Sequence, residues 1–212
     1  MDVELDTLLS GSVAWGMPAG ELLVSVQKWI TDRRPTCLVH PHGFYVLLLK
    51  RTDQAEWRLH LWPKGERRIS GMPAKIHTHD RHIESRILKG SLTNVDYLAK
   101  EVNGGGHPLY LVSYLGDRYA QTTTNVLQKS AIRLQVVETG RSHLRTGDRY
   151  RIERNTLHEA IVPDDQCTVT LVCMHSLEPK PVMVIGIDGY PDQLAFERIE
   201  AEASIYLEQL AN

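Results

Sequence analysis

Two histidines separated by a single residue, His77 and His79, are the residues whose types and spacing point most directly to chemistry. Side chains alternate between the two faces of a strand, so both imidazoles would project to the same side and hold one ion together. A third imidazole is available further along the chain, where His158 follows a strand-like stretch in which Tyr150 and Ile152 alternate with charged residues. The three histidines therefore predict a metal site inside a small β-barrel.

The remaining histidines do not share this pattern. A lone histidine on a strand is most often a hydrogen-bonded core or surface residue. We interpret five of them in this way: His40, His42, His82, His107 and His143.

The residues around both histidine groups resemble the two sequence motifs of the cupin superfamily. The series Gly71, His77-x-His79, Glu84 and Gly90 is similar to the first motif, and the stretch from Gly147 to His158 is similar to the second. The resemblance implies a mainly β fold, the cupin double-stranded β-helix or jelly-roll barrel, with helices before and after it. It also implies that the metal lies within the barrel.

The first motif is one residue shorter than usual, because five residues rather than six separate Glu84 from Gly90. Counting back from Gly90 places Ile83, and not Glu84, at the position of the cupin carboxylate ligand. Strand alternation agrees, since Ile83 and Ser85 share one face while Glu84 and Arg86 share the other. We expect three histidine ligands and no carboxylate, with Glu84 as the alternative fourth ligand.

Within the cupins, the layout is most similar to the thiol dioxygenases, which use three histidines on Fe(II). This resemblance covers residues 44–179 approximately, and it implies that His77, His79 and His158 are the ligands. It also implies that Trp62 forms an aromatic pocket wall, with His60 two residues earlier.

Several positions depart from that family. Cys173 and His175 stand where the family has a histidine and a tyrosine. The stretch around Tyr45 lacks the arginine that binds the substrate carboxylate in the family, and Ile83 replaces the crosslinked cysteine of some members. The resemblance therefore implies the architecture more than the substrate.

The function we predict is an Fe(II)-dependent oxidoreductase, a dioxygenase-like enzyme that uses O2 and a small anionic or chelating substrate. Imidazole ligands also suit zinc, nickel and copper, so the metal is not fixed by the ligands alone. We interpret His175 as the catalytic proton shuttle, because an imidazole titrates near neutral pH. The residues expected to line the substrate pocket are Tyr45, Arg58, His60, Trp62, Ile83, Ser85 and Cys173.

Two other functions fit the same pattern. The first is a non-redox cupin enzyme, an isomerase, lyase or hydrolase, in which Zn, Ni or Mn acts as a Lewis acid. The second is a cupin that binds a small ligand without turning it over. The fold cannot decide among these functions, because one scaffold hosts many activities.

The elements that position these residues form one expected domain, residues 1–212. Residues 1–34 predict two helices split at Gly16-Met17-Pro18, the second with an apolar stripe through Leu22, Val26 and Ile30. The barrel is expected over about residues 35–187 and opens with a hairpin whose arms are 44–49 and 57–62. A helix is expected over about residues 191–211, from the helix-like spacing of Leu194, Phe196 and Ile199.

Composition excludes several other classes. The chain has 212 residues and a formal net charge of −2, so it shows no basic balance for nucleic-acid binding. It has neither a signal-peptide pattern at its start nor an apolar run long enough to cross a bilayer. Its three cysteines are not spaced as a disulfide framework. We expect a cytoplasmic monomer or homodimer, with no nucleic-acid or membrane partner.

Overall fold

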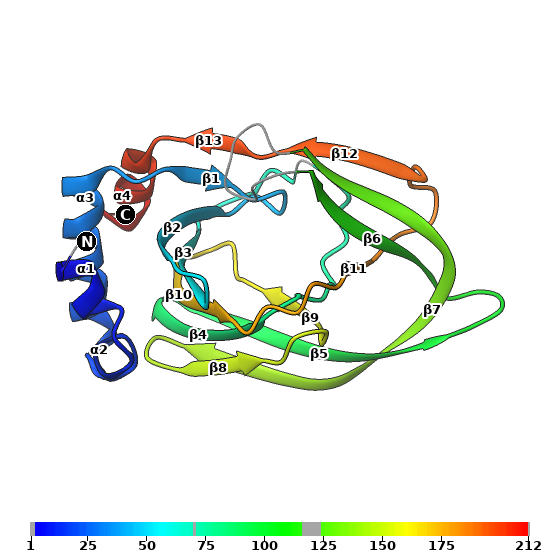
Figure 1. Cartoon of the computed structure of the whole chain (residues 1–212), viewed down its shortest axis with the longest axis horizontal. Helices are drawn as coiled ribbons and strands as arrows, with labels where there is room; N and C mark the ends of the chain where they lie inside the picture. The colour runs from blue at the N-terminus through cyan, green and yellow to red at the C-terminus, as the bar shows by residue number, and fades with distance from the viewer. Residues whose placement is uncertain (1–2, 70, 116–123, 212) are drawn as a thin grey trace.

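The computed structural model describes residues 3–69, 71–115 and 124–211, which form two antiparallel sheets and four helices. The two sheets curve around a common interior, as Figure 1 shows. The strands are β1 (Cys37–Val39), β2 (Tyr45–Arg51), β3 (Ala55–Trp62), β4 (His82–Lys89), β5 (Ser91–Glu101), β6 (His107–Leu115), β7 (Thr124–Arg145), β8 (Arg149–Ile152), β9 (Leu157–Ile161), β10 (Thr168–His175), β11 (Val182–Ile185), β12 (Gln193–Glu197) and β13 (Ile199–Ala201).

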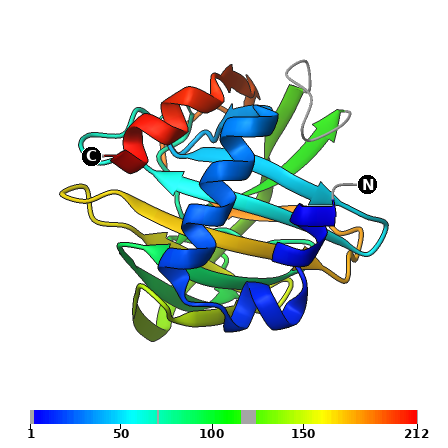
Figure 2. The same ribbon diagram turned by 90° about the vertical axis from the view of Figure 1, so that its left-hand side faces the viewer.

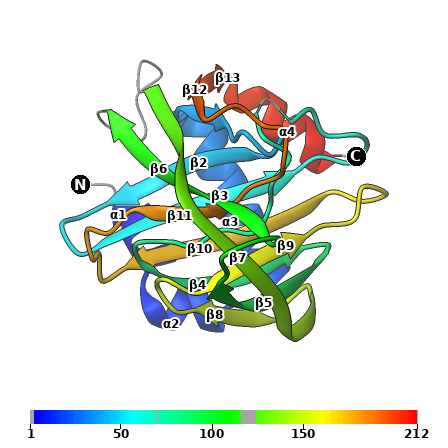
Figure 3. The ribbon, with the colours of Figure 1, turned by 90° about the vertical axis from the view of Figure 1, so that its right-hand side faces the viewer.

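The strand order interleaves the two halves of the chain. One sheet runs β13-β1-β2-β3-β10-β4-β8, and the other runs β11-β6-β7-β5-β9 with β12 paired to β7. In Figure 3, β7 crosses the face of the barrel opposite the helices. Late strands are therefore inserted between early ones, so that β10 lies between β3 and β4. This arrangement is the double-stranded β-helix, and the predicted cupin fold with terminal helices is confirmed.

The helices cover the outer face of the seven-stranded sheet (Figure 2). They are α1 (Val3–Leu8), α2 (Gly11–Gly16), α3 (Ala19–Arg33) and α4 (Ala203–Ala211). The predicted stripe is correct, since Leu22, Val26 and Ile30 of α3 are fully buried in the main hydrophobic core. The prediction of two N-terminal helices is wrong, because a second break at Ser10 divides the first helix into α1 and α2.

Residues of the seven-stranded sheet alternate between two environments. The outward-facing Leu47, Leu59 and Leu171 join the core beneath the helices. Their neighbours face the interior, where His60 and Val172 line a cavity. This alternation decides which side chain of each strand can take part in chemistry.

The C-terminal segment differs from the sequence-based expectation. Residues 193–201 form the strands β12 and β13, and the helix begins only at Ala203. Exposure along β12 alternates with a period of two, so that Leu194 and Phe196 are half-buried between exposed neighbours. This segment adds one strand to each sheet, because β12 pairs with β7 and β13 pairs with β1.

The glycine at the end of the first motif has a clear structural reason. Gly90 has a φ of +77° at the β4–β5 turn, and a Cβ there would lie 2.6 Å from the carbonyl oxygen of Cys167. Any other residue would be strained and would collide with the neighbouring chain. Among the described residues, no helix is both long and apolar enough to span a membrane.

Candidate metal centre and its cavity

Main-chain pairing brings the three motif histidines together. His77 and His158 are direct antiparallel partners, each donating its backbone N–H to the other's carbonyl oxygen at 3.0 Å. Side chains of such a pair lie on the same face of the sheet. His79 is fixed nearby, because its carbonyl oxygen accepts from the backbone N–H of Asn155 at 2.8 Å. The expected strand through His77 and His79 is reduced to isolated bridges, yet the alternation that matters is kept.

The three imidazoles form a nearly equilateral triangle. The ring centroids are separated by 4.7 Å for His77–His79, 4.8 Å for His77–His158 and 4.9 Å for His79–His158. One candidate ligand atom from each residue lies within 4.8 Å of the others. This geometry fits a single ion bound by three nitrogen atoms.

The protonation of these rings also suits a metal. Burial lowers the pKa of His77 and, together with the two neighbouring histidines, lowers that of His79 well below its usual range. Burial and then His77 lower the pKa of His158 to about 3. Nδ1 of His77 lies 2.7 Å from the carbonyl oxygen of Lys75, which can only accept, so Nδ1 carries the proton. The unprotonated Nε2 of His77 then has a lone pair that can bind a metal.

The histidine triangle opens into a cavity of about 260 Å³ inside the barrel. Arg58, His60 and Trp62 of β3 and Ile83 of β4 line it, as the sequence predicted. Ile83 thus occupies the inward position next to the histidines, in agreement with counting back from Gly90.

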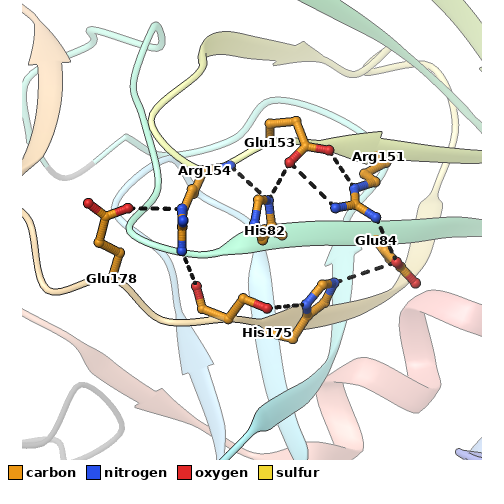
Figure 4. A network of polar contacts seen from close by, with 8 residues as sticks. His82, Glu84, Arg151, Glu153, Arg154, His175 and Glu178 are labelled. Atoms are coloured by element: carbon orange, nitrogen blue, oxygen red, sulfur yellow. Dashed lines mark hydrogen bonds and ion pairs between the residues drawn. The ribbon is translucent and has the colours of Figure 1, made fainter.

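Glu84 points away from the cavity, as expected from the shortened motif. Its Oε1 lies 3.6 Å from Nη1 of Arg151 and 3.5 Å from Nε2 of His175, on the outside of the barrel wall. Figure 4 shows these side chains in one outer network, whose labelled members are His82, Glu84, Arg151, Glu153, Arg154, His175 and Glu178. Arg86 does not join this network and instead donates to the carbonyl oxygen of Ala14 at 2.9 Å.

The predictions that His175 and Cys173 face the pocket are wrong. The register pairs Val172 with the inward Arg58, and Val172 and Met174 line the cavity. Cys173 and His175 therefore belong to the outward set of β10. Burial raises the pKa of the Cys173 thiol to about 11, which leaves it protonated and unreactive at neutral pH.

Two further predicted pocket residues do not line the cavity. Tyr45 packs outward against the main core, because it is the register partner of the outward Leu61. Ser85 is buried opposite Tyr150, its cross-strand partner on β8, and Tyr150 lines the cavity instead. Burial raises the pKa of the Tyr150 phenol, so this group stays protonated.

Two histidines that were interpreted as ordinary core or surface residues, His40 and His42, line the cavity. His40 stacks on Phe44 with a centroid separation of 4.1 Å, and the ring of His42 lies 6.0 Å from that of His77. Burial, followed by the charge effect of His77, lowers the pKa of His42 to about 4. Strand alternation could not have found them, because residues 40–44 form the turn between β1 and β2.

Arg198 was missed as well, and no sequence signal could have found it. It lies between β12 and β13, in the segment whose spacing resembles a helix, and it lines the cavity together with Phe196. The described lining contains four basic residues and no Asp or Glu; the basic residues are Arg58, Arg67, Lys75 and Arg198. The interior is therefore suited to an anion.

Arg58 and Arg67 are held in place by contacts with other parts of the protein. Nη2 of Arg58 lies 2.6 Å from Oε2 of Glu56, a carboxylate that also lies 2.6 Å from Nη1 of Arg81. Arg67 donates from all three guanidinium nitrogens to backbone carbonyls, including a 2.9 Å bond to Val162. Their charges contribute to the field inside the cavity, while their hydrogen bonds hold its walls.

No family model matches this sequence, and no curated protein matches it. Solved structures are similar only at a low level. An RmlC-like cupin from Shewanella frigidimarina is 11% identical, with 70% of this chain and 88% of that chain covered and a TM-score of 0.37. KdgF from a Halomonas species is 13% identical, with coverages of 69% and 93% and a TM-score of 0.38.

A third solved structure is the DMSP lyase DddQ from Ruegeria pomeroyi, which is 11% identical with a TM-score of 0.41. The similarity covers 76% of this chain and 64% of the lyase, so this chain spans slightly less than two thirds of that protein. At these values we take no argument about activity from the three structures.

Proposed function

We propose that this protein is a metal-dependent cupin enzyme, a mononuclear non-haem Fe(II) oxygenase that acts on O2 and a small anionic or chelating substrate. The observation that carries the proposal is the group of three buried imidazoles at the wall of a basic cavity. His77, His79 and His158 would hold the metal.

The donor set limits the choice of metal. Neutral imidazole nitrogens suit iron, zinc, copper and nickel, whereas magnesium and calcium prefer oxygen ligands. Three ligands from one side leave coordination positions for other molecules, as in non-haem iron oxygenases. When bound, Fe(II) would supply the one-electron chemistry that O2 needs in order to react with an organic molecule.

The absence of a carboxylate ligand supports an anionic substrate. Three neutral histidines do not offset the charge of a divalent ion, and the described cavity lining adds four basic residues without an acidic one. An anion entering this interior gains from both sources, because charges attract each other more strongly inside a protein than in bulk water. The size of the cavity, about 260 Å³, favours a small metabolite over a drug-sized molecule.

His42 replaces His175 as the candidate for proton transfer. Its ring lies in the cavity, 6.0 Å from the ring of His77, so a small molecule beside the three histidines would meet it. His42 is neutral at physiological pH, since its pKa is lowered to about 4. Its ring can accept a hydrogen bond from an acidic group of the substrate, and it takes up the proton only from an acid that is stronger than its own conjugate acid. His175 cannot act in this way, because its ring lies outside the barrel wall.

The test combines metal analysis with oxygen uptake. The purified protein should contain about one iron per chain, and His77→Ala, His79→Ala and His158→Ala should each lose most of it, since no fourth protein ligand compensates. His107→Ala, which changes an exposed histidine outside both motifs, is the matched control and should retain its iron. Full iron occupancy in any of the three ligand variants would contradict the assignment.

Oxygen-electrode measurements with a panel of small carboxylates and hydroxy acids then separate the alternatives. Substrate-dependent uptake in the iron-loaded protein supports the oxygenase. Turnover without oxygen, with zinc, nickel or manganese bound, would instead support the Lewis-acid enzyme. Tight ligand binding without turnover would support the binding module.

A further inference from the structure

Within the described chain, His60 has a buried polar atom without a hydrogen-bond partner, in a residue that lines the cavity. It lies on β3 between Arg58 and Trp62 on the inward face, and it lines the cavity. Its Nε2 atom is buried and has no hydrogen-bond partner among the described residues. Buried polar atoms are rarely left unpaired in native proteins, so an unpaired one in the wall of a cavity is a candidate partner for a molecule bound there.

The surroundings of His60 define the chemistry of that molecule. Burial, followed by the positive charges of Arg58 and Arg198, lowers the pKa of His60 to about 3, so its ring is neutral. A neutral imidazole can donate one N–H, and the two arginines make the region favourable for a negative acceptor. The rings of Phe44 and Trp62 lie 5.2 Å and 5.7 Å from that of His60, which gives this region apolar walls.

We propose that His60 and Arg198 form a carboxylate-binding subsite, separate from the three histidines, that holds the distal end of the substrate. Nε2–H of His60 donates to one carboxylate oxygen, and the guanidinium of Arg198 supplies the charge. Glu56 keeps Arg58 oriented behind this subsite through the 2.6 Å contact with its Nη2.

The two subsites belong to one small cavity. His60 and Arg198 line the same cavity of about 260 Å³ as the three histidines. A molecule that reaches both must be short. The substrate that fits both is a small acid with a chelating group at the end opposite its carboxylate. This inference deepens the proposed function, and it rests on that function only where it assigns the bound carboxylate to the substrate.

The C-terminal strands thereby acquire a role in recognition. Arg198 follows β12, which pairs with β7 of one sheet, and precedes β13, which pairs with β1 of the other. The connection between β12 and β13 thus carries Arg198 across the edge of both sheets to the cavity. Specificity for the carboxylate then depends on a segment that lies beyond both histidine motifs.

The test is an NMR titration with propionate, using propionamide as the uncharged analogue of the same shape. The full chain is titrated at constant ionic strength, first as purified and then after metal removal. Propionate should shift the ring resonances of His60 in both forms, whereas propionamide should bind at least about tenfold more weakly.

Two substitutions identify the subsite, and each has a matched control on the outer side of the barrel wall. His60→Phe and Arg198→Gln should each weaken propionate binding by about tenfold or more. His175→Phe and Arg151→Gln make the same chemical changes in the outer network and should leave the affinity within about twofold, since exposed charges there are screened. If His60→Phe fails to fold, Arg198→Gln decides the question, because Arg198 is only half-buried.

Unchanged propionate affinity in folded His60→Phe or Arg198→Gln would overturn the proposal, as would equal affinities for propionate and propionamide or no binding at all. This failure differs from failure of the proposed function. A protein that retains no metal but binds propionate through His60 would contradict the enzyme and leave the subsite intact.

Discussion

Replacing Glu56 by Gln tests whether a buried charge cluster supports the cavity. Glu56 is only 4% exposed, and its carboxylate lies 2.6 Å from a guanidinium nitrogen of Arg58 and 2.6 Å from one of Arg81. Arg81 follows the candidate ligand His79 by two positions, so Glu56 connects one wall of the cavity to the segment that carries His77 and His79. Removing the charge leaves two largely buried cations with a weaker acceptor.

The expected cost follows from this geometry. Breaking a buried ion pair by removing one partner costs about 3–5 kcal/mol. Gln keeps the volume and one carbonyl acceptor, so we expect the lower end of this range, about 3 kcal/mol. For a chain of this length, that loss corresponds to a fall of about 6–12 °C in Tm.

Urea and thermal denaturation of the metal-free protein measure the effect without a contribution from metal binding. Arg51→Gln is the matched control, because Arg51 approaches the same carboxylate at 3.5 Å but its side chain is 38% exposed. Its loss should cost no more than about 1 kcal/mol. A Glu56→Gln protein as stable as the Arg51→Gln protein would refute the argument that the cluster depends on its buried negative charge.

Three other predictions follow from the placement of single side chains. Glu84→Gln should keep its full metal content by elemental analysis, because the carboxylate contacts Arg151 outside the wall; a loss like that of a histidine variant would show a fourth ligand. The metal-free protein should lose stability as the pH falls below about 6.5. At these pH values the histidines of the unfolded chain bind protons, whereas buried rings of the folded protein, such as His60 with a pKa of about 3, stay unprotonated. The free energy of unfolding should fall by about 1.4 kcal/mol per pH unit for each such ring. His60→Phe should reduce this dependence of the unfolding free energy on pH, as measured by urea titrations at pH 7, 6 and 5. An unchanged dependence would contradict the lowered pKa of His60. Iodoacetamide should leave Cys173 unmodified in the native protein at neutral pH, because its thiol pKa is about 11, and rapid alkylation seen by mass spectrometry would disprove this.

The histidine triangle was predictable from sequence because its determinants are local. Alternation alone puts His77 and His79 on one side, and the second motif supplies His158 at the end of another strand. The shortened spacing before Gly90 also sufficed to turn Ile83 inward and Glu84 outward. In each case a short segment fixes the direction of its own side chains.

The inward face of β10 was not predictable in this way. Val169 and Leu171 on one face are as apolar as Val172 and Met174 on the other, and all four are buried. One set packs beneath the helices and the other lines the cavity, so hydrophobicity does not distinguish them. Only the pairing of β10 with β3, which matches Val172 to Arg58, decides which set faces the interior.

The same physical reason explains why the C-terminal strands were mistaken for a helix. Leu194, Phe196 and Ile199 fit a helical stripe when the segment is considered alone, yet β7 and β1 each offer an unpaired edge to it. Pairing with these edges satisfies backbone groups of both sheets, and this gain overrides a weak local preference. The strand pairing also changes the lining of the cavity. A helix over this segment would not follow the two sheet edges, and these edges place Arg198 in the same cavity wall as His60. Arg198 could not be predicted from the sequence, because its position depends on long-range strand pairing. We expect this same residue to decide which acid the protein accepts.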